Sequence, residues 1–408
     1  MKNELTRDNV LDLSLGCISA AETIKEAYDS GYDSLIIPSR GACPIYNGIK
    51  NALIEKAKED PDYEKFLKAV DVPPFLKKHP YIGKLSEKEA RRFKIIPYPL
   101  TADVHLSENL LNRYYTDLDH VTDAIRKYGA KVISKFLQDP EERLNSDEFT
   151  FLLFVHNEVE NRKGVADYYK KLNKIKKPIL LDTVISGRAM TTVMEALDSF
   201  GIDYHAIAII DREGEKLRKE YRKKIEERER LGKLTQIPVK RIISEDRGAS
   251  LLGVSACIYP ELGFYAKDYA DLDLAAAVTW HVISDYDIER LNSDRRDVKK
   301  RLNEYKEVYK NYSQTIREGI KLLSEPENNR KKELENLIDK RIDKTLNLIK
   351  KYGVLNHEEE NFDYSIFVNR RPIKEVYETS SHVIHIFFPD EENKKLIETY
   401  IRNYKPRK

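Results

Sequence analysis

Two short segments carry the residue types that bind sugar hydroxyls and phosphate groups. The first, KKPILLDTVISGRAM over residues 176–190, places Asp182 at the end of an apolar run and follows it with a Ser186-Gly187 turn. A carboxylate in that place can accept hydrogen bonds from sugar hydroxyls. A turn that opens a helix offers a phosphate free backbone N–H groups and the positive end of the helix dipole. Ser186 adds a hydroxyl, and Gly187 lets the backbone approach a ligand closely.

The second segment has the same layout further upstream. In SGYDSLIIPSRGACPIYNGIKNAL (30–53), an apolar strand at Ser34–Ile37 precedes a Pro38-Ser39-Arg40-Gly41 loop, and a helix follows through Ile45 to Leu53. Backbone amides of such a loop converge on an anion, and Arg40 adds a guanidinium. For both segments the plainer alternative is an ordinary turn of an α/β fold.

The segment at 176–190 resembles the phosphoribosyl-pyrophosphate (PRPP) signature of type I phosphoribosyltransferases. The segment at 30–53, which precedes it in the chain, resembles the pyrophosphate loop, so the two stand in the family's order. The resemblance implies that Asp182 holds the ribose hydroxyls and that Mg²⁺ is bound mainly through PRPP, with no direct protein ligand. It assigns pyrophosphate to Ser39, Arg40 and Gly41. It assigns the 5′-phosphate to Ser186, Gly187, Arg188, Ala189 and Thr191.

The match departs from the family pattern at three positions. Leu181 stands where the family has the first of two acids, Ile185 where purine-salvage members have Asp, and Ala189 where a Thr closes the loop. The loss at Leu181 weakens the handling of ribose and Mg²⁺, and Ile185 argues against 6-oxopurine salvage.

Two hypotheses about function follow from the resemblance and its departures. The first is a PRPP-dependent pentosyltransferase that transfers phosphoribosyl to a base or related nucleophile and releases pyrophosphate. The alternative is a regulator or effector of the same fold that binds PRPP or a nucleotide with weak or no transfer, and that is linked to nucleic acid. A third interpretation keeps only a generic α/β ligand-binding fold.

Further candidates for the site lie away from the two segments. Arg91 and Arg92, with Lys84 and Lys88, fall in a basic stretch that resembles the family's mobile lid, which excludes water from the reactive carbon. Trp280 is a candidate for stacking on a base. Asp285, in Ser-Asp-Tyr, resembles a short element of purine phosphoribosyltransferases. A surface helix and a core tryptophan are the alternatives.

The elements that must position these residues follow from hydrophobic periodicity. Strands are predicted at 34–37, 95–98, 149–155, 179–181, 204–210, 239–244 and 255–259, and Asp211 is predicted to cap a helix. Helices are predicted at 16–30, 48–69 and 108–137. We therefore expect an α/β domain over 1–286, a phosphoribosyltransferase-like parallel sheet flanked by helices, with an insertion around 55–150.

The character of the sequence changes near residue 287. Leu and Tyr at helical spacing over 287–352, interrupted at 324–329, predict a helical hairpin. Strands at 362–369 and 382–389 and a helix at 391–404 are expected to complete a mainly helical α+β C-terminal module, 287–408. Helical hairpins often form interfaces, so we expect a homo-oligomer.

Composition limits the remaining classes. With 34% charged residues, no apolar run near the ~18–20 residues of a membrane span and no secretion signal, the chain is expected in the cytoplasm, without a membrane partner. Three scattered cysteines form neither a metal-ligand spacing nor a disulfide framework. The net charge of +2 gives no overall nucleic-acid signature. Residues 212–241 hold 12 Lys/Arg against 6 Glu, which predicts a solvated helix, with nucleic-acid binding as the alternative.

Overall fold

A six-stranded parallel sheet organises the α/β part of the chain. The computed structural model describes residues 5–38, 41–71, 93–97, 175–213, 216–244, 258–259, 281–282, 296–325 and 330–352. The strand order is β2-β3-β1-β4-β5-β6, and every neighbouring pair is parallel. In chain order these strands are β1 (Ser34–Ile37), β2 (Val70–Asp71), β3 (Phe93–Pro97), β4 (Pro178–Val184), β5 (His205–Asp211) and β6 (Leu234–Val239). A separate antiparallel pair joins β7 (Ile258–Tyr259) to β8 (His281–Val282).

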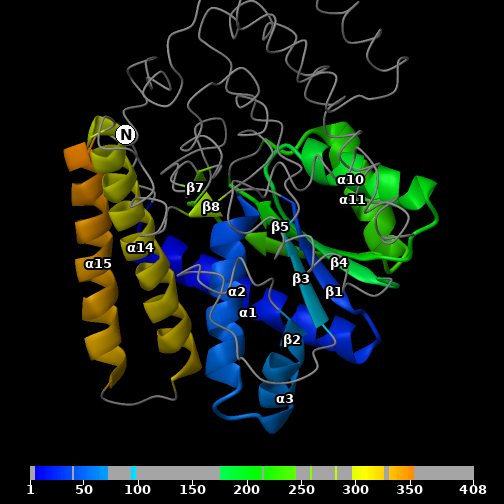
Figure 1. Cartoon of the computed structure of the whole chain (residues 1–408), viewed down its shortest axis with the longest axis horizontal. Helices are drawn as coiled ribbons and strands as arrows, with labels where there is room; N and C mark the ends of the chain where they lie inside the picture. Colours follow the sequence, from blue (N-terminus) through cyan, green and yellow to red (C-terminus); the bar gives the residue numbers. More distant parts are fainter. Residues whose placement is uncertain are drawn as a thin grey trace, which may run out of the picture.

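Helices cover both faces of the sheet (Figure 1). One face carries α1 (Arg7–Asp29) and α2 (Ala42–Lys56), with α3 (Pro61–Ala69) beside α2, and the other carries α10 (Arg188–Ser199) and α11 (Lys219–Arg230). The apolar runs of the strands are nearly continuous because neither face meets water. Alternation along β4 puts Ile179 and Leu181 in the core shared with α1 and α2, so Leu180 and Asp182 lie on the opposite face, toward α10.

A helical hairpin of α14 (Arg296–Ser324) and α15 (Arg330–Tyr352) forms a further layer outside α1 and α2 (Figure 1). Tyr309 and Ile316 of α14 belong to the same apolar core as α1 and α2. Small residues allow the close approach: a Cβ added to Gly48 of α2 would lie 2.5 Å from Cys17 Sγ and 3.5 Å from Ile316 Cγ2. The hairpin is therefore packed directly against the helices that cover the sheet.

Several predicted elements are confirmed. Strand β1 has the predicted bounds, β5 lies within one residue of the predicted position, and β3 lies within two. The hairpin helices end at Ser324 and restart at Arg330, at the predicted break. Helix α1 begins at Arg7, well before the predicted start, because Thr6 Oγ1 accepts a hydrogen bond from Asn9 N at 3.3 Å and caps it.

Two element predictions were wrong. The single helix at 48–69 is two helices, because α2 ends at Lys56 and Asp60, followed by Pro61, caps a new helix through Asp62 N at 2.8 Å. The strand predicted at 239–244 ends where it was expected to begin. β6 instead occupies Leu234–Val239 and includes an exposed Pro238, which is tolerated because β6 is the last strand of the described sheet.

Other predictions fall outside the described residues. These are the helix at 108–137, the strand at 149–155 and the elements expected at 362–369, 382–389 and 391–404. The domain division at 286/287 and the homo-oligomer also stay predictions. In the part of the chain that the structure describes, no helix is both long and apolar enough to cross a membrane.

Candidate functional site

The two candidate phosphate loops leave the sheet from neighbouring strands. β1 and β4 pair in parallel, with Leu35 opposite Ile179 and Ile36 opposite Leu180. From β1 the chain crosses through α2 toward β3, whereas from β4 it crosses through α10 toward β5, on the other face. The strand order thus reverses between β1 and β4. In open α/β sheets, ligands bind in the crevice at this switch point, outside the carboxyl ends of the strands.

The turn between β4 and α10 leaves the first amides of α10 without an acceptor inside the helix. Gly187 is the N-cap of α10 with φ +84°. The first intrahelical hydrogen bond runs from Thr191 N to Gly187 O at 3.2 Å. The amides of Ala189 and Met190 therefore have no carbonyl acceptor within the helix. Arg188 N donates to Ser186 Oγ at 3.4 Å. These donors and the helix dipole suit a phosphate group.

Gly187 is fixed by packing as well as by its dihedral angle. A Cβ at this position would lie 2.6 Å from Leu217 Cδ1 and 2.8 Å from Tyr221 Cβ. Arg218 N also donates to Ser186 O at 3.2 Å. The close approach that this glycine permits is therefore made by the start of α11. The sequence analysis missed these contacts, although Leu217, Tyr221 and Ile225, spaced by four residues, mark an apolar face on an otherwise charged helix.

Asp182 lies deeper than the sequence suggested. It sits two residues before the end of β4, its residue is 3% exposed, and its Oδ1 accepts a hydrogen bond from Thr183 N at 2.9 Å. The apolar run ends at Leu181, but the strand continues to Val184 because β5 pairs with it along that length. The carboxylate therefore offers little exposed surface to a ribose.

The threonines of α10 use their hydroxyl protons within the helix. Thr191 is 1% exposed, and its Oγ1 lies 2.9 Å from Gly187 O and 3.0 Å from Arg188 O. Thr192 Oγ1 donates to Arg188 O at 2.9 Å. The backbone amides, rather than these hydroxyls, are the groups arranged to hold a phosphate at this turn.

Helix α2 begins at the neighbouring loop and is firmly held. Gly41 is its N-cap in right-handed helical conformation, and residues 41–50 are all buried. The Cys43 thiol lies 3.9 Å from the Tyr309 hydroxyl of α14, and burial raises the pKa of this thiol to about 12. Ser39 and Arg40 lie outside the described residues, as do Arg91, Arg92, Trp280 and Asp285.

Asp211, at the end of β5, has a structural role. Its Oδ2 accepts a hydrogen bond from Ile242 N at 3.0 Å and lies 3.5 Å from Arg241 Nε. The prediction that it caps a helix was wrong, because α11 begins only at Lys219 and Asp211 instead holds the chain that leaves β6.

The described residues do not fit a protein-held Mg²⁺ site. They contain no group of three or more His, Cys, Asp or Glu side chains close enough to share a metal ion. Asp182 is a buried carboxylate on the strand before the turn, and Asp211 on the next strand is engaged by Arg241.

Comparison with known proteins found no relative of this chain. No protein-family model, curated protein or solved structure matches the chain. Function must therefore be argued from the switch point of the sheet and the two loops that meet there.

Proposed function

We propose that the chain binds a ribose carrying phosphate groups, PRPP or a nucleotide, at the switch point between β1 and β4. The observation that supports this proposal is the parallel pairing of these two strands, which brings the carboxyl end of β1, shortly before Gly41, and the carboxyl end of β4, before the turn at 185–187, to the same end of the sheet. Each loop opens a helix, so two helix N-termini meet an anion there. A ligand with a phosphate group at each end of a sugar matches two such loops.

The proposed activity is transfer of phosphoribosyl from PRPP to a nitrogenous base. The base nitrogen attacks ribose C1, the bond from C1 to the pyrophosphate oxygen breaks, and its electron pair leaves with pyrophosphate. The transition state is positive at the sugar and negative at the leaving group. The start of α2 would stabilise the leaving group while the amides of α10 hold the 5′-phosphate, so the protein contributes positioning and electrostatics rather than covalent chemistry.

A second candidate is a protein of the same fold that binds the ligand without transfer. Two observations favour it: the carboxylate of Asp182 is almost fully buried, and Leu181 replaces the other acid of the family signature with a buried apolar side chain. Ribose would then be held by fewer polar contacts than a transferase uses.

Calorimetry on the full chain tests the binding step, with PRPP and Mg²⁺ in one series and ribose 5-phosphate in another. We expect PRPP binding that Asp182→Asn weakens about tenfold, since the amide keeps the bond from Thr183 N but loses the charge. The matched control is Asp203→Asn, a 54% exposed carboxylate that precedes β5 at the opposite edge of the sheet. It should change affinity less than about twofold.

The results separate three cases: no ribose-phosphate site, a transferase and a regulator. No heat at millimolar PRPP, or equal losses in both variants, would overturn the proposal. If PRPP binds, pyrophosphate release across a panel of bases identifies a transferase, and binding without release identifies the regulator.

A further inference from the structure

Contacts within the protein decide which charged side chains of the α14–α15 hairpin are exposed at the surface. On α15, Asp339 and Glu335 turn toward α1, where Arg7 Nε donates to Asp339 Oδ1 at 2.9 Å and Arg7 Nη1 lies 3.8 Å from Glu335 Oε2. Glu318 of α14 is 6% exposed and lies 3.1 Å from Lys321 Nζ and 3.9 Å from Arg341 Nη2. Asp339 and Glu335 share the single cation of Arg7 and keep 44% and 34% of their side chains exposed, whereas Glu318 is buried among cations.

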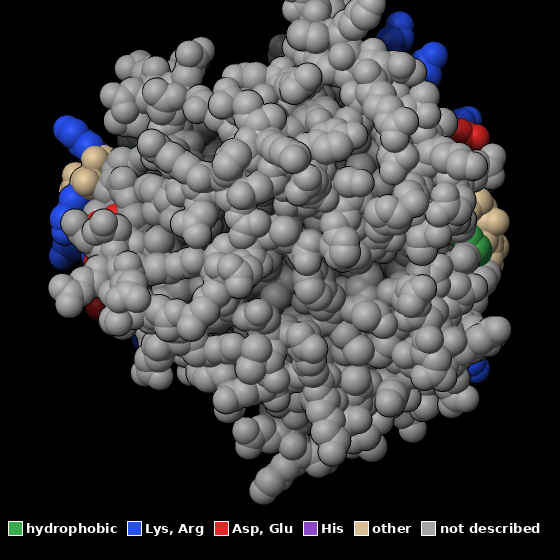
Figure 2. All heavy atoms as spheres, turned by 45° about the horizontal axis from the view of Figure 1, so that its top comes forward, with side chains coloured by type: hydrophobic (Ala, Val, Ile, Leu, Met, Phe, Trp, Pro, Cys, Tyr) green, Lys and Arg blue, Asp and Glu red, His purple; other side chains and the backbone are tan. Residues whose placement is uncertain are grey.

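The outward face of α15 is left strongly basic. Between residues 330 and 351, seven of its exposed side chains are Lys or Arg and two are acidic. The basic ones are Arg330, Lys331, Lys332, Lys340, Lys344, Lys350 and Lys351, and the acidic ones are Glu333 and Asp343. This excess of five among the exposed side chains exceeds the net charge of +2 of the whole chain, and of the seven cations Arg330 is paired with Glu325 Oε1 at 3.3 Å. Figure 2 shows Lys and Arg side chains on the left margin, the side where Figure 1 places α15.

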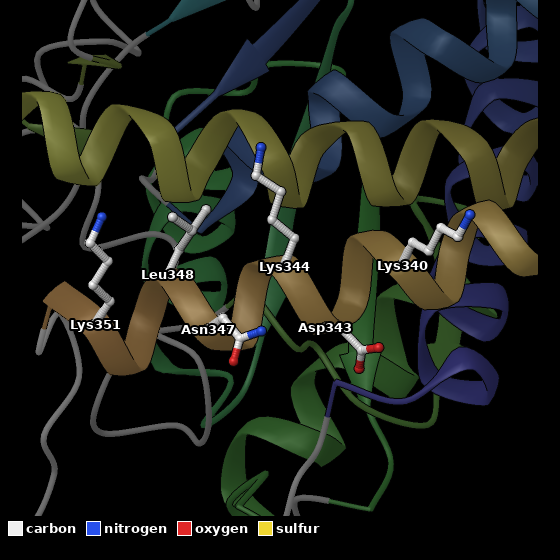
Figure 3. Close-up of a pocket in the computed structure, with 6 residues that line it drawn as sticks. All are labelled: Lys340, Asp343, Lys344, Asn347, Leu348 and Lys351. Carbon is white, nitrogen blue, oxygen red and sulfur yellow. The ribbon is translucent and has the colours of Figure 1, made fainter.

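Part of this face surrounds an open depression along the helix (Figure 3). Lys344 and Lys351 project to the same side of α15 as Leu348, while Asn347 and Asp343 point to the other side. Lys340, Lys344 and Lys351 are four and seven residues apart, so their backbone positions rise by about 6 Å and then about 10 Å along the axis. A row of cations at such spacing suits a chain of phosphates better than one compact anion.

Helix α11 lies in the basic segment identified from the sequence, but here cations, rather than acidic side chains, contact the rest of the protein. Its cations turn inward: Lys224 Nζ pairs with Glu195, and Arg228 Nη2 lies 2.8 Å from Asp198 Oδ2. Over residues 216–230, six exposed Lys or Arg side chains stand among four exposed Glu side chains. The positive excess of the α11 segment is therefore smaller among its exposed side chains than in the sequence, whereas the positive excess of α15 is larger among its exposed side chains.

We propose that the outer face of α15 binds the phosphate backbone of a nucleic-acid duplex, without reading base sequence. The basic face extends over about 32 Å, close to one turn of a duplex, which carries one negative charge per about 1.7 Å. A membrane surface fits less well, because interfacial helices insert large apolar side chains, and the exposed large hydrophobic residues in the described ranges (Leu15, Leu231 and Leu323) lie outside α15. The proposal is independent of the ribose-phosphate site.

Fluorescence anisotropy with the full chain and a labelled mixed-sequence duplex of about 20 base pairs tests it, at about 50 to 200 mM salt. The test variant is Lys340→Gln/Lys344→Gln/Lys350→Gln, and the matched control is Lys219→Gln/Arg222→Gln/Lys223→Gln on α11. All six side chains are exposed, so both proteins should fold. We expect the α15 variant to lose at least about tenfold in affinity, and its slope of log K against log salt to fall by about 2.7, or 0.9 per lost phosphate contact. The control should change affinity less than about twofold.

Three outcomes would overturn the proposal. One is no binding by the wild-type chain at the lowest salt, and another is equal losses in the two variants, which would reflect net charge alone. The third is binding to vesicles containing phosphatidylserine, lost in the α15 variant, without binding to the duplex, which would assign the face to a membrane.

Discussion

Gly187 and Tyr221 are packed so closely that a Cβ on the glycine would lie 2.8 Å from the Cβ of Tyr221. This contact joins the turn at the candidate site to the first turns of α11 on the same face of the sheet. Because Gly187 also has φ +84°, its conformation and its surroundings both exclude a side chain.

Replacing Gly187 with Ala should therefore cost more than the backbone strain alone. We expect a loss of about 2–4 kcal/mol in the free energy of unfolding, from the left-handed conformation and from overpacking against α11. Urea denaturation measures it. Gly201→Ala is the matched control, because Gly201 has φ +64° with nothing within 4 Å of an added Cβ, so it reports the backbone term alone, about 1 kcal/mol. Equal losses at the two positions would show that α11 does not restrain the turn.

The crossing of α1 and α2 at Gly48 gives a second test, by a double-mutant cycle. An added Cβ would lie 2.5 Å from Cys17 Sγ, so Gly48→Ala should destabilise the chain by about 1 kcal/mol even though alanine favours the helix. In the Cys17→Ala background the same change should cost less, because the sulfur is gone and only the 3.2 Å contact with the Cβ of residue 17 remains tight. Urea denaturation of all four proteins measures the coupling, expected at about 1 kcal/mol or more. Additive effects would contradict the packing described between α1 and α2.

The sequence predicted elements well where the signal was local. The limits of β1 follow from an apolar run between Asp33 and Pro38, and the hairpin break follows from a polar segment with a proline at 326. Asp182 was recognised, but its depth in β4 was not, because that depends on how far β5 pairs with it.

Charge distribution could not be predicted from local sequence for the same reason. Both α11 and α15 appear in the sequence as mixed-charge helices. Which charges reach the surface depends on partners far along the chain: Asp198 faces Arg228, and Arg7 faces Asp339, 332 residues away. Counting charged residues along the sequence therefore pointed to α11 as the basic surface, whereas tertiary contacts leave α15 with the larger excess of exposed cations.

Burial should make two cysteine thiols unreactive in the folded chain. Desolvation raises the pKa of Cys17 and of Cys43 to about 12, so their reactive thiolate forms are scarce near neutral pH. Pulsed alkylation followed by peptide mass spectrometry should leave both unmodified in buffer and modify both in denaturing urea. Rapid modification of Cys43 alone in buffer would mean that the start of α2 opens locally, against the burial of residues 41–50.

His205 should make folding stability depend on pH. Its Nε2 lies 2.9 Å from Thr235 Oγ1, and burial lowers its pKa below the usual 6.5, partly opposed by a hydrogen bond with the backbone of Gly232. The folded state therefore favours the neutral ring. The contribution of His205 to stability is fully present above about pH 6.5 and is lost as the pH falls through the folded-state pKa.

Urea unfolding at intervals from about pH 8 to pH 5 measures this contribution as the difference between the wild-type chain and His205→Gln. Glutamine keeps a polar group beside Thr235 but does not titrate, so the free energy of unfolding should fall less steeply with acid in the variant. Because the remaining titratable groups are common to both proteins, their effects cancel in the difference. Parallel curves for the two proteins would show that His205 has the same pKa folded and unfolded, and that the partial burial of its ring beside Thr235 is wrong.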